Sequence, residues 1–542
     1  MKLKFKKRIV LPILLLVVFL GGVSFKNDYF EIAKQIEIFT TLFKELNMNY
    51  VDETNPAALM DTAIKGMLSD LDPYTNFLNE QDVEEFKIRA KGEYSGIGAM
   101  VKQEDNKLLV VEPYKGYPAD KAGLKAGDEI TKIGDTNLSD FKDDATELLK
   151  GNANSEVAIT YIRNGATKTT AITREEIEVH AVPFYHMVDK ETGYIVLSKF
   201  NRKASEETEN ALKALKEKGA KRIVLDLRDN PGGLLVEAIN VCNLFVAKGE
   251  VIVTTKSKVK KFNQEFKTRK NPVDTKIPLT VLVNGGSASA SEIVSGALQD
   301  LDRAVILGAQ SFGKGLVQRP VKLSYGTQLK VTISRYYTPS GRCIQALDYW
   351  HRDENGNAVR NTKFNEFKTK HGRTVYDGGG IIPDIEVNDL KRSSLTNAIE
   401  ANDLVFDYAT NYYYSHQLKS IGDFKFTDAD FQKFKTFVAQ SNFDYQTATE
   451  NALQKVTDQK EFQELGPEVK ADYEKMLKDI QQRKITAIDT YKGKLKKDLE
   501  DEIIKRYFYR EGLYDYYINN DEAIIAATKL MENTTKFNKI LK

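Results

Sequence analysis

Short apolar runs alternate with helical patterns through the middle of this 542-residue chain. Residues 194–197 and 223–227 are predicted strands, and a helical pattern near 205–218 separates them. A third run, 279–283, is apolar at all but one position. Strand–helix–strand units form parallel sheets through right-handed crossovers, and the strands of such sheets are buried on both faces. The sequence therefore predicts an α/β core.

Ser289 lies where the third run meets the next helical pattern, residues 290–298. The segment between them is rich in glycine and serine, which favours a sharp strand-to-helix corner. Such a corner exposes its side chain close to the free N–H groups and the positive dipole end of the helix. Ser289 is therefore a candidate nucleophile. The segment from Ser289 to Glu292 also matches a capping box, so a helix cap is the structural alternative.

Lys314 stands between two glycines, Gly313 and Gly315. A serine hydroxyl is a weak nucleophile at neutral pH, and a buried, neutral lysine can accept its proton in place of histidine. A solvated surface lysine is one alternative. A phosphate-binding loop is another, because Gly308, Gly313 and Lys314 fit G-x-x-x-x-G-K. That loop needs Ser or Thr next, where this chain has Gly315.

Residues 71–387 resemble the carboxyl-terminal processing peptidases, also called tail-specific proteases. Several separated motifs carry the resemblance: S-A-S-A-S-E-I around Ser289, L-D-L-R-D-N-P-G-G at 225–233, Y-T-P-S-G-R at 337–342, G-I-I-P-D at 380–384 and L-D-P-Y-T at 71–75. The interval of 25 positions from Ser289 to Lys314 also matches. One departure is Asp229, where the family pattern has asparagine.

The resemblance implies a serine endopeptidase with a ClpP/crotonase-like α/β core. It implies that Ser289 is the nucleophile, that Lys314 is its base and that Gln318 orients the lysine. It also implies an oxyanion hole formed by N–H groups of Ala290 and of Gly232 or Gly233, with Gly232 preferred. A glycine pair that follows a strand and opens a helix is suited to presenting N–H groups to negative charge.

Residues 88–178 resemble a PDZ domain, through a Y-S-G-I-G segment from Tyr94 and a glycine-rich stretch at 117–130. PDZ domains bind a peptide as an added strand and hold its terminal carboxylate on backbone N–H groups. The expected carboxylate-binding residues are Ser95, Gly96, Ile97 and Gly98. A plain glycine hairpin is the alternative. The resemblance implies protein or peptide substrates bound by their C-termini.

The two ends of the chain differ from this middle part. Residues 1–26 carry a basic cluster before an apolar stretch at 9–25, which predicts a signal peptide or a membrane anchor and an extracytoplasmic location for the rest. Residues 27–87 are predicted to be helical. The protease core is expected at 179–390 and a helical C-terminal extension at 391–542, where Phe431, Phe434 and Val438 repeat at helical spacing.

Composition limits the other classes of function. The formal net charge is +2, which gives no field that would favour nucleic acid. The five histidines form no metal-binding spacing and the two cysteines no disulfide framework, so we expect neither a metal nor another cofactor. Cys242 lies on an apolar helical stripe and is expected in the core, as is Cys343. Self-association is left open.

Two other functions remain as alternatives. A Ser-His-Asp hydrolase would use His180 or His186, since members of a triad need not be close in sequence. Neither histidine lies in a motif, whereas Lys314 and Gln318 do. The second alternative is a catalytically silent PDZ scaffold, which would be expected to have lost Ser289, Lys314 or Gln318, and all three are present.

Overall fold

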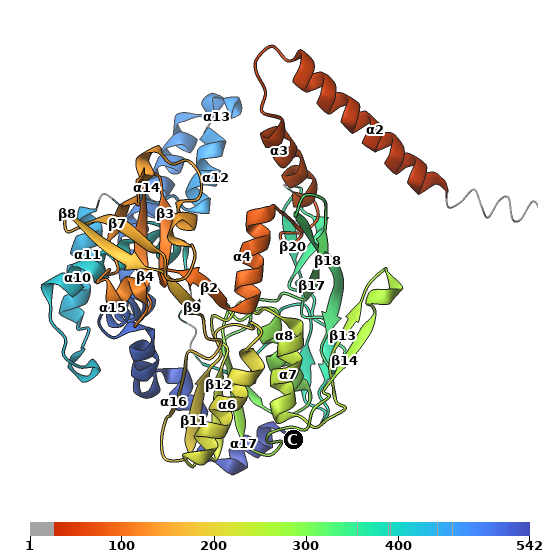
Figure 1. The fold of residues 1–542 in the computed structure, drawn as a ribbon, viewed down its shortest axis with the longest axis vertical. Coiled ribbons are helices and arrows are strands. Elements are labelled where there is room, and N and C mark those ends of the chain that lie inside the picture. Colours follow the sequence, from red (N-terminus) through yellow and green to blue (C-terminus); the bar gives the residue numbers. More distant parts are fainter. Residues whose placement is uncertain (1–25, 355, 388–389, 391, 442, 458) are drawn as a thin grey trace, which may run out of the picture. The chain divides into compact units, whose positions relative to one another are not determined.

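The computed structural model describes residues 26–354, 356–387, 390, 392–441, 443–457 and 459–542 (Figure 1). These residues form two compact units. The first consists of the described residues up to Leu78 together with Pro320–Val331, and the second of Asn79–Arg319 with Thr332–Lys542. No helix within the described residues is long and apolar enough to cross a bilayer, and the apolar stretch at 9–25 lies outside them.

The first unit is mainly helical, as the sequence predicts for the N-terminal region. It contains α2 (Lys26–Asn49), α3 (Pro56–Ser69) and β1 (Asn76–Leu78). The side chain of Asn55 caps α3 by accepting the N–H of Ala58, and Pro56 occupies the first turn, where its missing N–H costs nothing. Within this unit β1 pairs antiparallel with residues 328–330.

A small β domain begins the second unit after α4 (Glu80–Lys91). Its sheet has the order β3-β4-β5-β7-β8, and β2 pairs separately with β9. The core contains Leu108, Ile130 and Ile159, all with no exposed surface. Its elements are β2 (Glu93–Gly96), β3 (Ala99–Glu104), β4 (Lys107–Pro113), α5 (Pro118–Lys121), β5 (Glu129–Ile133), β6 (Thr136–Asn137), η1 (Leu138–Asp140), η2 (Ala145–Leu149), β7 (Glu156–Arg163), β8 (Ala166–Thr173) and β9 (Glu175–Glu178).

The predicted α/β core is present as a six-stranded sheet with the order β10-β11-β12-β15-β16-β23. Only β10 is antiparallel to its neighbour. Helix α6 (Ala204–Glu217) makes the crossover from β11 to β12, as expected from the sequence. The strands are β10 (Phe184–Met187), β11 (Thr192–Val196), β12 (Arg222–Asp226), β15 (Leu279–Val283), β16 (Val305–Gly308) and β23 (Ile385–Glu386).

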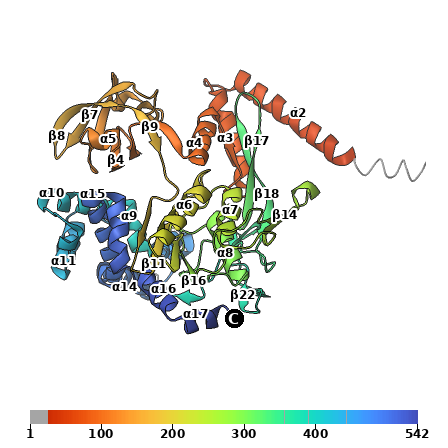
Figure 2. The ribbon, with the colours of Figure 1, turned by 60° about the horizontal axis from the view of Figure 1, so that its bottom comes forward.

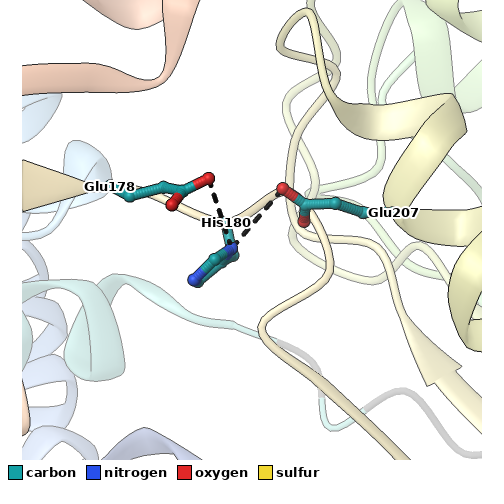
Figure 3. Close-up of side chains that lie close together, drawn as sticks. All are labelled: Glu178, His180 and Glu207. Atoms are coloured by element: carbon teal, nitrogen blue, oxygen red, sulfur yellow. Dashed lines mark ion pairs between the residues drawn. The ribbon is translucent and has the colours of Figure 1, made fainter.

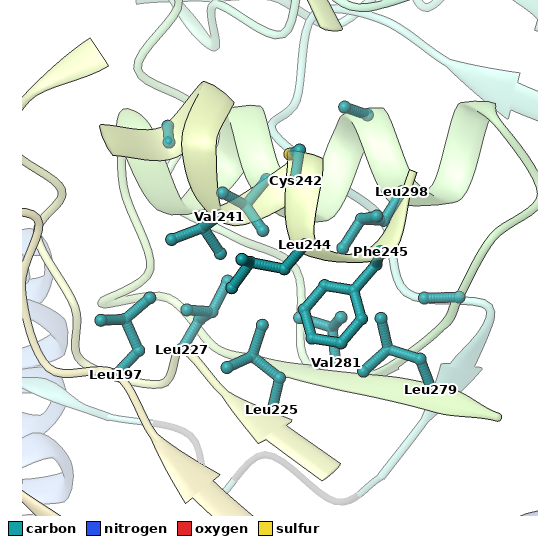
Figure 4. Packing of buried hydrophobic residues seen from close by; sticks show 14 of the residues in the cluster. Leu197, Leu225, Leu227, Val241, Cys242, Leu244, Phe245, Leu279, Val281 and Leu298 are labelled. Atoms are coloured by element: carbon teal, nitrogen blue, oxygen red, sulfur yellow. The ribbon is translucent and has the colours of Figure 1, made fainter. Parts of the chain in front are cut away.

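Helices cover both faces of this sheet, because alternate side chains of each strand point to opposite faces. On one face Leu225 and Val281 pack with α7 (Leu235–Phe245) and α8 (Ala290–Asp300) (Figure 4). Cys242 of α7 is fully buried there, as predicted, whereas Cys343 is only partly buried.

The other face is covered by the end of the chain. Helices α16 (Glu522–Glu532) and α17 (Thr534–Ile540) lie beside the strands (Figure 2). Their buried side chains form one cluster with Val224 and Leu282 of the sheet. The last helices of the C-terminal region thus complete the core of the α/β sheet.

The remaining strands of this part of the chain form smaller sheets of their own. Residues 335–337 of β18 (Gln328–Tyr337) pair with β13 (Val251–Lys256), which pairs with β14 (Gln264–Lys267). The remaining elements of this region are η3 (Lys260–Phe262), β17 (Leu316–Lys322), β19 (Leu347–Arg352), β20 (Ala358–Arg360), β21 (Glu366–Lys368) and β22 (Thr374–Tyr376).

The C-terminal region is helical, as predicted. Its core holds the expected stripe of Phe431, Phe434 and Val438, packed with Leu495 and Leu499. Its elements are α9 (Ser394–Ala401), α10 (Leu404–Ser415), η4 (Ile421–Asp423), α11 (Asp428–Gln440), α12 (Ala448–Thr457), α13 (Lys460–Glu464), α14 (Pro467–Thr490) and α15 (Lys492–Asn520). Helix α15 is interrupted at Tyr509, where φ is 59°.

Candidate active site

Ser289 occupies a sharp corner between β15 and α8, as the sequence predicts. Its φ of 55° and ψ of −109° are unusual for a residue other than glycine. Such a conformation costs on the order of 1–3 kcal/mol and persists only where the surrounding structure enforces it. The turn before it is held by Ser287, whose hydroxyl donates to the carbonyl of Leu227 at 2.8 Å. Strain at a partly buried serine is characteristic of functional sites.

Glu292, in the first turn of α8, joins the Ser289 corner to the Lys314 loop. Its Oε2 accepts the N–H of Ser289 at 2.8 Å and the N–H of Lys314 at 2.9 Å. Its Oε1 accepts the N–H of Gly313 at 2.7 Å and the hydroxyl of Ser311 at 2.6 Å. Because one oxygen binds both N–H groups, the backbones of Ser289 and Lys314 lie next to each other.

The sequence indicated Glu292 only as part of a capping box. Its contact with the N–H of Ser289 is one half of that motif, but its contacts with residues 311–314 are not local. Glu292 is fully buried, and this burial raises the pKa of its carboxyl to about 7. The four hydrogen bonds oppose that rise, because each stabilises the ionised form.

The glycines on either side of Lys314 allow its loop to pack closely. A Cβ on Gly313, where φ is 89°, would lie 2.4 Å from the Cβ of Ala346. A Cβ on Gly315 would lie 2.9 Å from the backbone nitrogen of Gln345. The N–H of Gly315 donates to Oε1 of Gln345 at 2.7 Å. These contacts explain both glycines by packing, without a phosphate.

Gln318 lies four residues further on, in β17. Its Nε2 donates to Oγ1 of Thr332 at 3.1 Å, so the amide is held by the neighbouring strand. The buried Tyr336, also in β18, donates its hydroxyl to the carbonyl of Ser289 at 3.2 Å. No local pattern indicates Thr332 or Tyr336, because strand pairing alone brings them to the site.

Gly232 lies directly against the nucleophile corner. A Cβ at this position, where φ is 97°, would come within 2.9 Å of both the Cβ of Ser289 and the nitrogen of Ala290. Its own N–H donates to Oδ1 of Asn230 at 2.9 Å, inside the turn. Ala290 is the first residue of α8, where backbone N–H groups have no partner within the helix. The two residues predicted for the oxyanion hole are thus adjacent.

The predicted carboxylate loop of the β domain spans the end of β2. The carbonyls of Ile97 and Gly98 accept the N–H groups of Ala119 and Tyr114 at 2.8 and 2.9 Å. Since the two ends of a trans peptide group point in opposite directions, the N–H of Gly98 points away from α5. A Cβ on Gly98, where φ is 71°, would lie 2.5 Å from the Cβ of Tyr117. The hydroxyl of Ser95 is buried and has no hydrogen-bond partner among the residues that the structure describes.

The two histidines that a Ser-His-Asp triad would use, His180 and His186, contact groups other than the candidate nucleophile. Nδ1 of His180 lies 3.5 Å from Oε1 of Glu207 and 4.0 Å from Oε1 of Glu178, and the ring is half exposed (Figure 3). Nδ1 of His186 lies 2.9 Å from the carbonyl oxygen of its neighbour Met187. Neither ring is hydrogen-bonded to Ser289 within the described part of the chain. The geometry therefore gives the Ser-His-Asp alternative no support.

Comparison with family models gives three matches. Residues 191–349 match peptidase family S41, residues 95–173 match a PDZ domain, and residues 395–531 match the C-terminal helical domain of probable PDZ-proteases. The catalytic candidates all lie within the first of these matches. The predicted carboxylate loop lies at the start of the second.

Two curated relatives agree with these matches. The chain is 38% identical over 339 residues to a carboxy-terminal-processing protease of Bartonella bacilliformis, covering 61% of this chain and 77% of the relative. It is 35% identical over 310 residues to a probable CtpA-like serine protease of Staphylococcus aureus, covering 56% of this chain and 61% of that relative. A solved photosystem II D1 C-terminal processing protease is 28% identical, with 64% and 86% of the two chains covered and a TM-score of 0.37.

An α/β serine peptidase with a PDZ domain and a C-terminal helical domain is the class that these matches define. The chain belongs to the carboxy-terminal-processing proteases of peptidase family S41. The family predicted from the sequence, its fold and its enzymatic class are confirmed.

Proposed function

We propose that Ser289 is the nucleophile and Lys314 the general base of this peptidase. The observation that carries the assignment is the pair of hydrogen bonds to Oε2 of Glu292, from the N–H groups of Ser289 and Lys314. A neutral lysine amine accepts the proton of the hydroxyl as the oxygen attacks the substrate carbonyl, and then returns it to the leaving amine. Gln318, held by Thr332, restricts the lysine side chain.

The negative charge that develops on the attacked carbonyl oxygen is stabilised by hydrogen-bond donors directed at it. The N–H of Ala290 at the start of α8 is one such donor, favoured by the dipole of the helix. Gly232 supplies the second position, because it lies so close to both Ser289 and Ala290 that a Cβ on it would come within 2.9 Å of each. Without substrate its N–H donates to Oδ1 of Asn230, and it turns to the oxyanion when substrate binding displaces that internal hydrogen bond.

The PDZ domain selects substrates by their free C-termini. PDZ recognition places a terminal carboxylate on backbone N–H groups and adds the peptide as a strand. The segment from Ser95 to Gly98 fits this role, since its carbonyls are bound on one side by Ala119 and Tyr114. The buried hydroxyl of Ser95, which bonds to no other group in the described part of the chain, offers a further donor within the loop.

The first test is cleavage of an unfolded protein. Ser289→Ala and Lys314→Ala should each abolish cleavage with unchanged folding, and the double variant should be no worse than either single variant, since the two groups transfer one proton. Lys276→Ala, at an exposed lysine of the same core, is the matched control and should retain full activity. Activity that survives Lys314→Ala but disappears on changing His180 or His186 would replace the lysine mechanism with a histidine triad.

The second test concerns the substrate tail. Amidation of the C-terminus removes a charge-assisted hydrogen bond worth about 1.5–3 kcal/mol, so an amidated substrate should be cleaved roughly 10- to 150-fold more slowly. A peptide too short to reach the PDZ domain should show no difference between its amide and its free acid. Equal rates for long amidated and free tails would remove the PDZ domain from substrate selection.

We also propose that the enzyme works outside the cytoplasm, attached or exported through residues 1–26. The basic cluster before the apolar stretch at 9–25 supports this, because positive residues remain on the cytoplasmic side.

We propose in addition that the protein associates with itself, since α2 leaves the apolar side chains of Ile32, Ile36 and Phe39 exposed to solvent. Cell fractionation tests the first proposal, and the molar mass of the chain without residues 1–26 in solution tests the second.

A further inference from the structure

Arg228 is the residue just before the turn that carries Gly232, and its guanidinium is held from two sides. Nε and Nη2 bond the carboxylate of Asp226, with Nη2 to Oδ2 at 2.7 Å. Nη1 bonds both oxygens of Asp521, at 2.8 and 3.0 Å. Asp226 belongs to β12, whereas Asp521 lies 293 positions along the chain from Arg228, in the C-terminal helices.

Asp521 is itself a rigid anchor. It is the N-cap of α16, and its Oδ1 accepts the N–H groups of Ala523 at 3.0 Å and Ile524 at 3.1 Å. Helix α16 is packed on the face of the sheet that contains Val224 and Leu282. Burial would raise the pKa of Asp521, but the Arg228 charge and its hydrogen bonds outweigh burial and lower that pKa. Asp521 is therefore an ionised, fixed partner for Arg228.

The turn that begins at Arg228 is built against the nucleophile corner. Asp229 follows with a φ of 56° and exchanges hydrogen bonds with Asn284, at 2.9 and 3.0 Å. The carbonyl of Asn230 accepts the hydroxyl of Ser291 at 2.8 Å. Gly232 then lies against Ser289, since a Cβ on Gly232 would come within 2.9 Å of the Cβ of Ser289. A shift of Arg228 would therefore be transmitted to the oxyanion position within four residues.

We propose that Asp521 of the C-terminal helices is a positioning residue of the active site, which fixes Arg228 and thereby the turn that presents Gly232 to Ser289. This inference rests on the proposed function of Ser289 and Gly232. A misplacement of about 1 Å in a catalytic group can cost on the order of a hundredfold in rate. The C-terminal helices are then part of the catalytic assembly and not only an extension of it.

Asp521→Asn is the sharpest test, because it changes neither the shape of the side chain nor its ability to cap a helix. If Oδ1 keeps the cap, the amide NH₂ replaces Oδ2 and faces the Nη1 donor of Arg228. We expect kcat to fall about 10- to 100-fold while KM for a tail-bearing substrate stays within about twofold. Glu522→Gln, the same change at the exposed neighbouring residue, is the matched control and should leave both constants unchanged.

A second variant guards against loss of folding. Asp521→Ser also retains an N-cap but is too short to reach Arg228, so it should show the same fall in kcat. Both variants should keep the circular dichroism of the parent, and the affinity of a tail peptide should be unchanged when measured in a Ser289→Ala background. A purely structural role would instead lower the melting temperature and change kcat only in proportion to the folded fraction.

The outcomes separate this inference from the proposed function. If Ser289→Ala is inactive and both folded Asp521 variants cleave at the parental rate, Asp521 does not position the site, and the assignment of Ser289 stands. If Ser289→Ala remains active, the proposed function fails first. A fall in kcat for Asp521→Asn that equals the fall for Glu522→Gln would also overturn the positioning role.

Discussion

Glu292 is the residue on which the two loops of the proposed active site converge. All four groups that bond its carboxylate are donors, at 2.6 to 2.9 Å. Glu292→Gln would place an NH₂ group against two of them and leave those donors unsatisfied. We expect kcat to fall about a hundredfold or more and the free energy of unfolding to fall by roughly 1–3 kcal/mol, measured by steady-state kinetics and urea denaturation.

The control for this variant is Glu366→Gln, an exposed glutamate of the same core, which should alter neither quantity. A Glu292→Gln enzyme with parental kcat would show that the carboxylate is only a helix cap.

The ionisation of Glu292 also predicts opposite pH dependences for stability and activity. Burial raises its pKa from 4.5 to about 7, so the folded state binds this proton more tightly than the unfolded state does. This contribution to the free energy of unfolding is complete below pH 4.5 and is lost as the pH rises through about 7. Activity should rise over the same interval, because only the carboxylate can accept all four hydrogen bonds.

Urea denaturation and kcat, each measured at several pH values, test whether stability falls while activity rises with pH. In Glu292→Gln the pH-dependent part of the unfolding free energy should disappear. If the parent and this variant lost stability in parallel between about pH 5 and 8, another group would be responsible.

At the same scale, sequence reasoning found the residues that lie in local motifs. Ser289, at a strand-to-helix corner, and Lys314, between two glycines, were singled out by short-range pattern, whereas Gln318, inside β17, came from the resemblance to the family. The central role of Glu292 was missed, because its partners at 311–314 are close only in the folded chain. Asp229, the one departure from the family pattern, has a φ of 56°, a conformation that both Asp and Asn tolerate.

At the scale of elements, the strands and helices of the core agree with the sequence because continuous apolar runs and helical repeats are strong local signals. Residues 194–197, 223–227 and 279–283 lie in or next to β11, β12 and β15, and α6 links the first two. The exception is α16. Nothing local shows that a helix at the end of the chain covers a sheet formed about 300 residues earlier, because that contact depends on tertiary packing alone.

The docking of α16 on the sheet should be a major source of stability. Ile524 is fully buried in the cluster that includes Val224 and Leu282. Ile524→Ala should therefore lower the free energy of unfolding of the α/β core by about 2–5 kcal/mol, measured by chemical denaturation. The adjacent Ile525 is only partly buried, so Ile525→Ala should cost clearly less. Equal losses of unfolding free energy in the two variants would mean that packing of Ile524 against the sheet does not stabilise α16.

At the scale of the second unit, the C-terminal helices contact the PDZ domain as well as the core. Arg510 of α15 makes two hydrogen bonds to Glu112 of β4, one of them from Nε to Oε1 at 3.0 Å. The hydroxyl of the neighbouring Tyr509 donates to Oδ1 of Asp120 at 2.6 Å. Helix α16 follows α15 directly and begins with the Asp521 cap at Arg228. The two consecutive helices α15 and α16 thus contact the PDZ domain and the turn beside the nucleophile.

The Arg510–Glu112 pair should therefore be energetically coupled, in contrast to an ordinary surface pair. Glu112 is 12% exposed and Arg510 is 42% exposed, so solvent screens part of the attraction. A double-mutant cycle with Glu112→Gln and Arg510→Gln should give a coupling of about 1 kcal/mol in chemical denaturation. The exposed pair Arg392–Glu400, at 60% and 62%, is the matched control and should give a coupling near zero. Each single variant should also be cleaved faster by limited proteolysis between the PDZ domain and the core, because the PDZ domain has then lost its Arg510–Glu112 contact with α15. A coupling no larger than that of the control pair would mean that α15 only lies beside the PDZ domain and does not hold it.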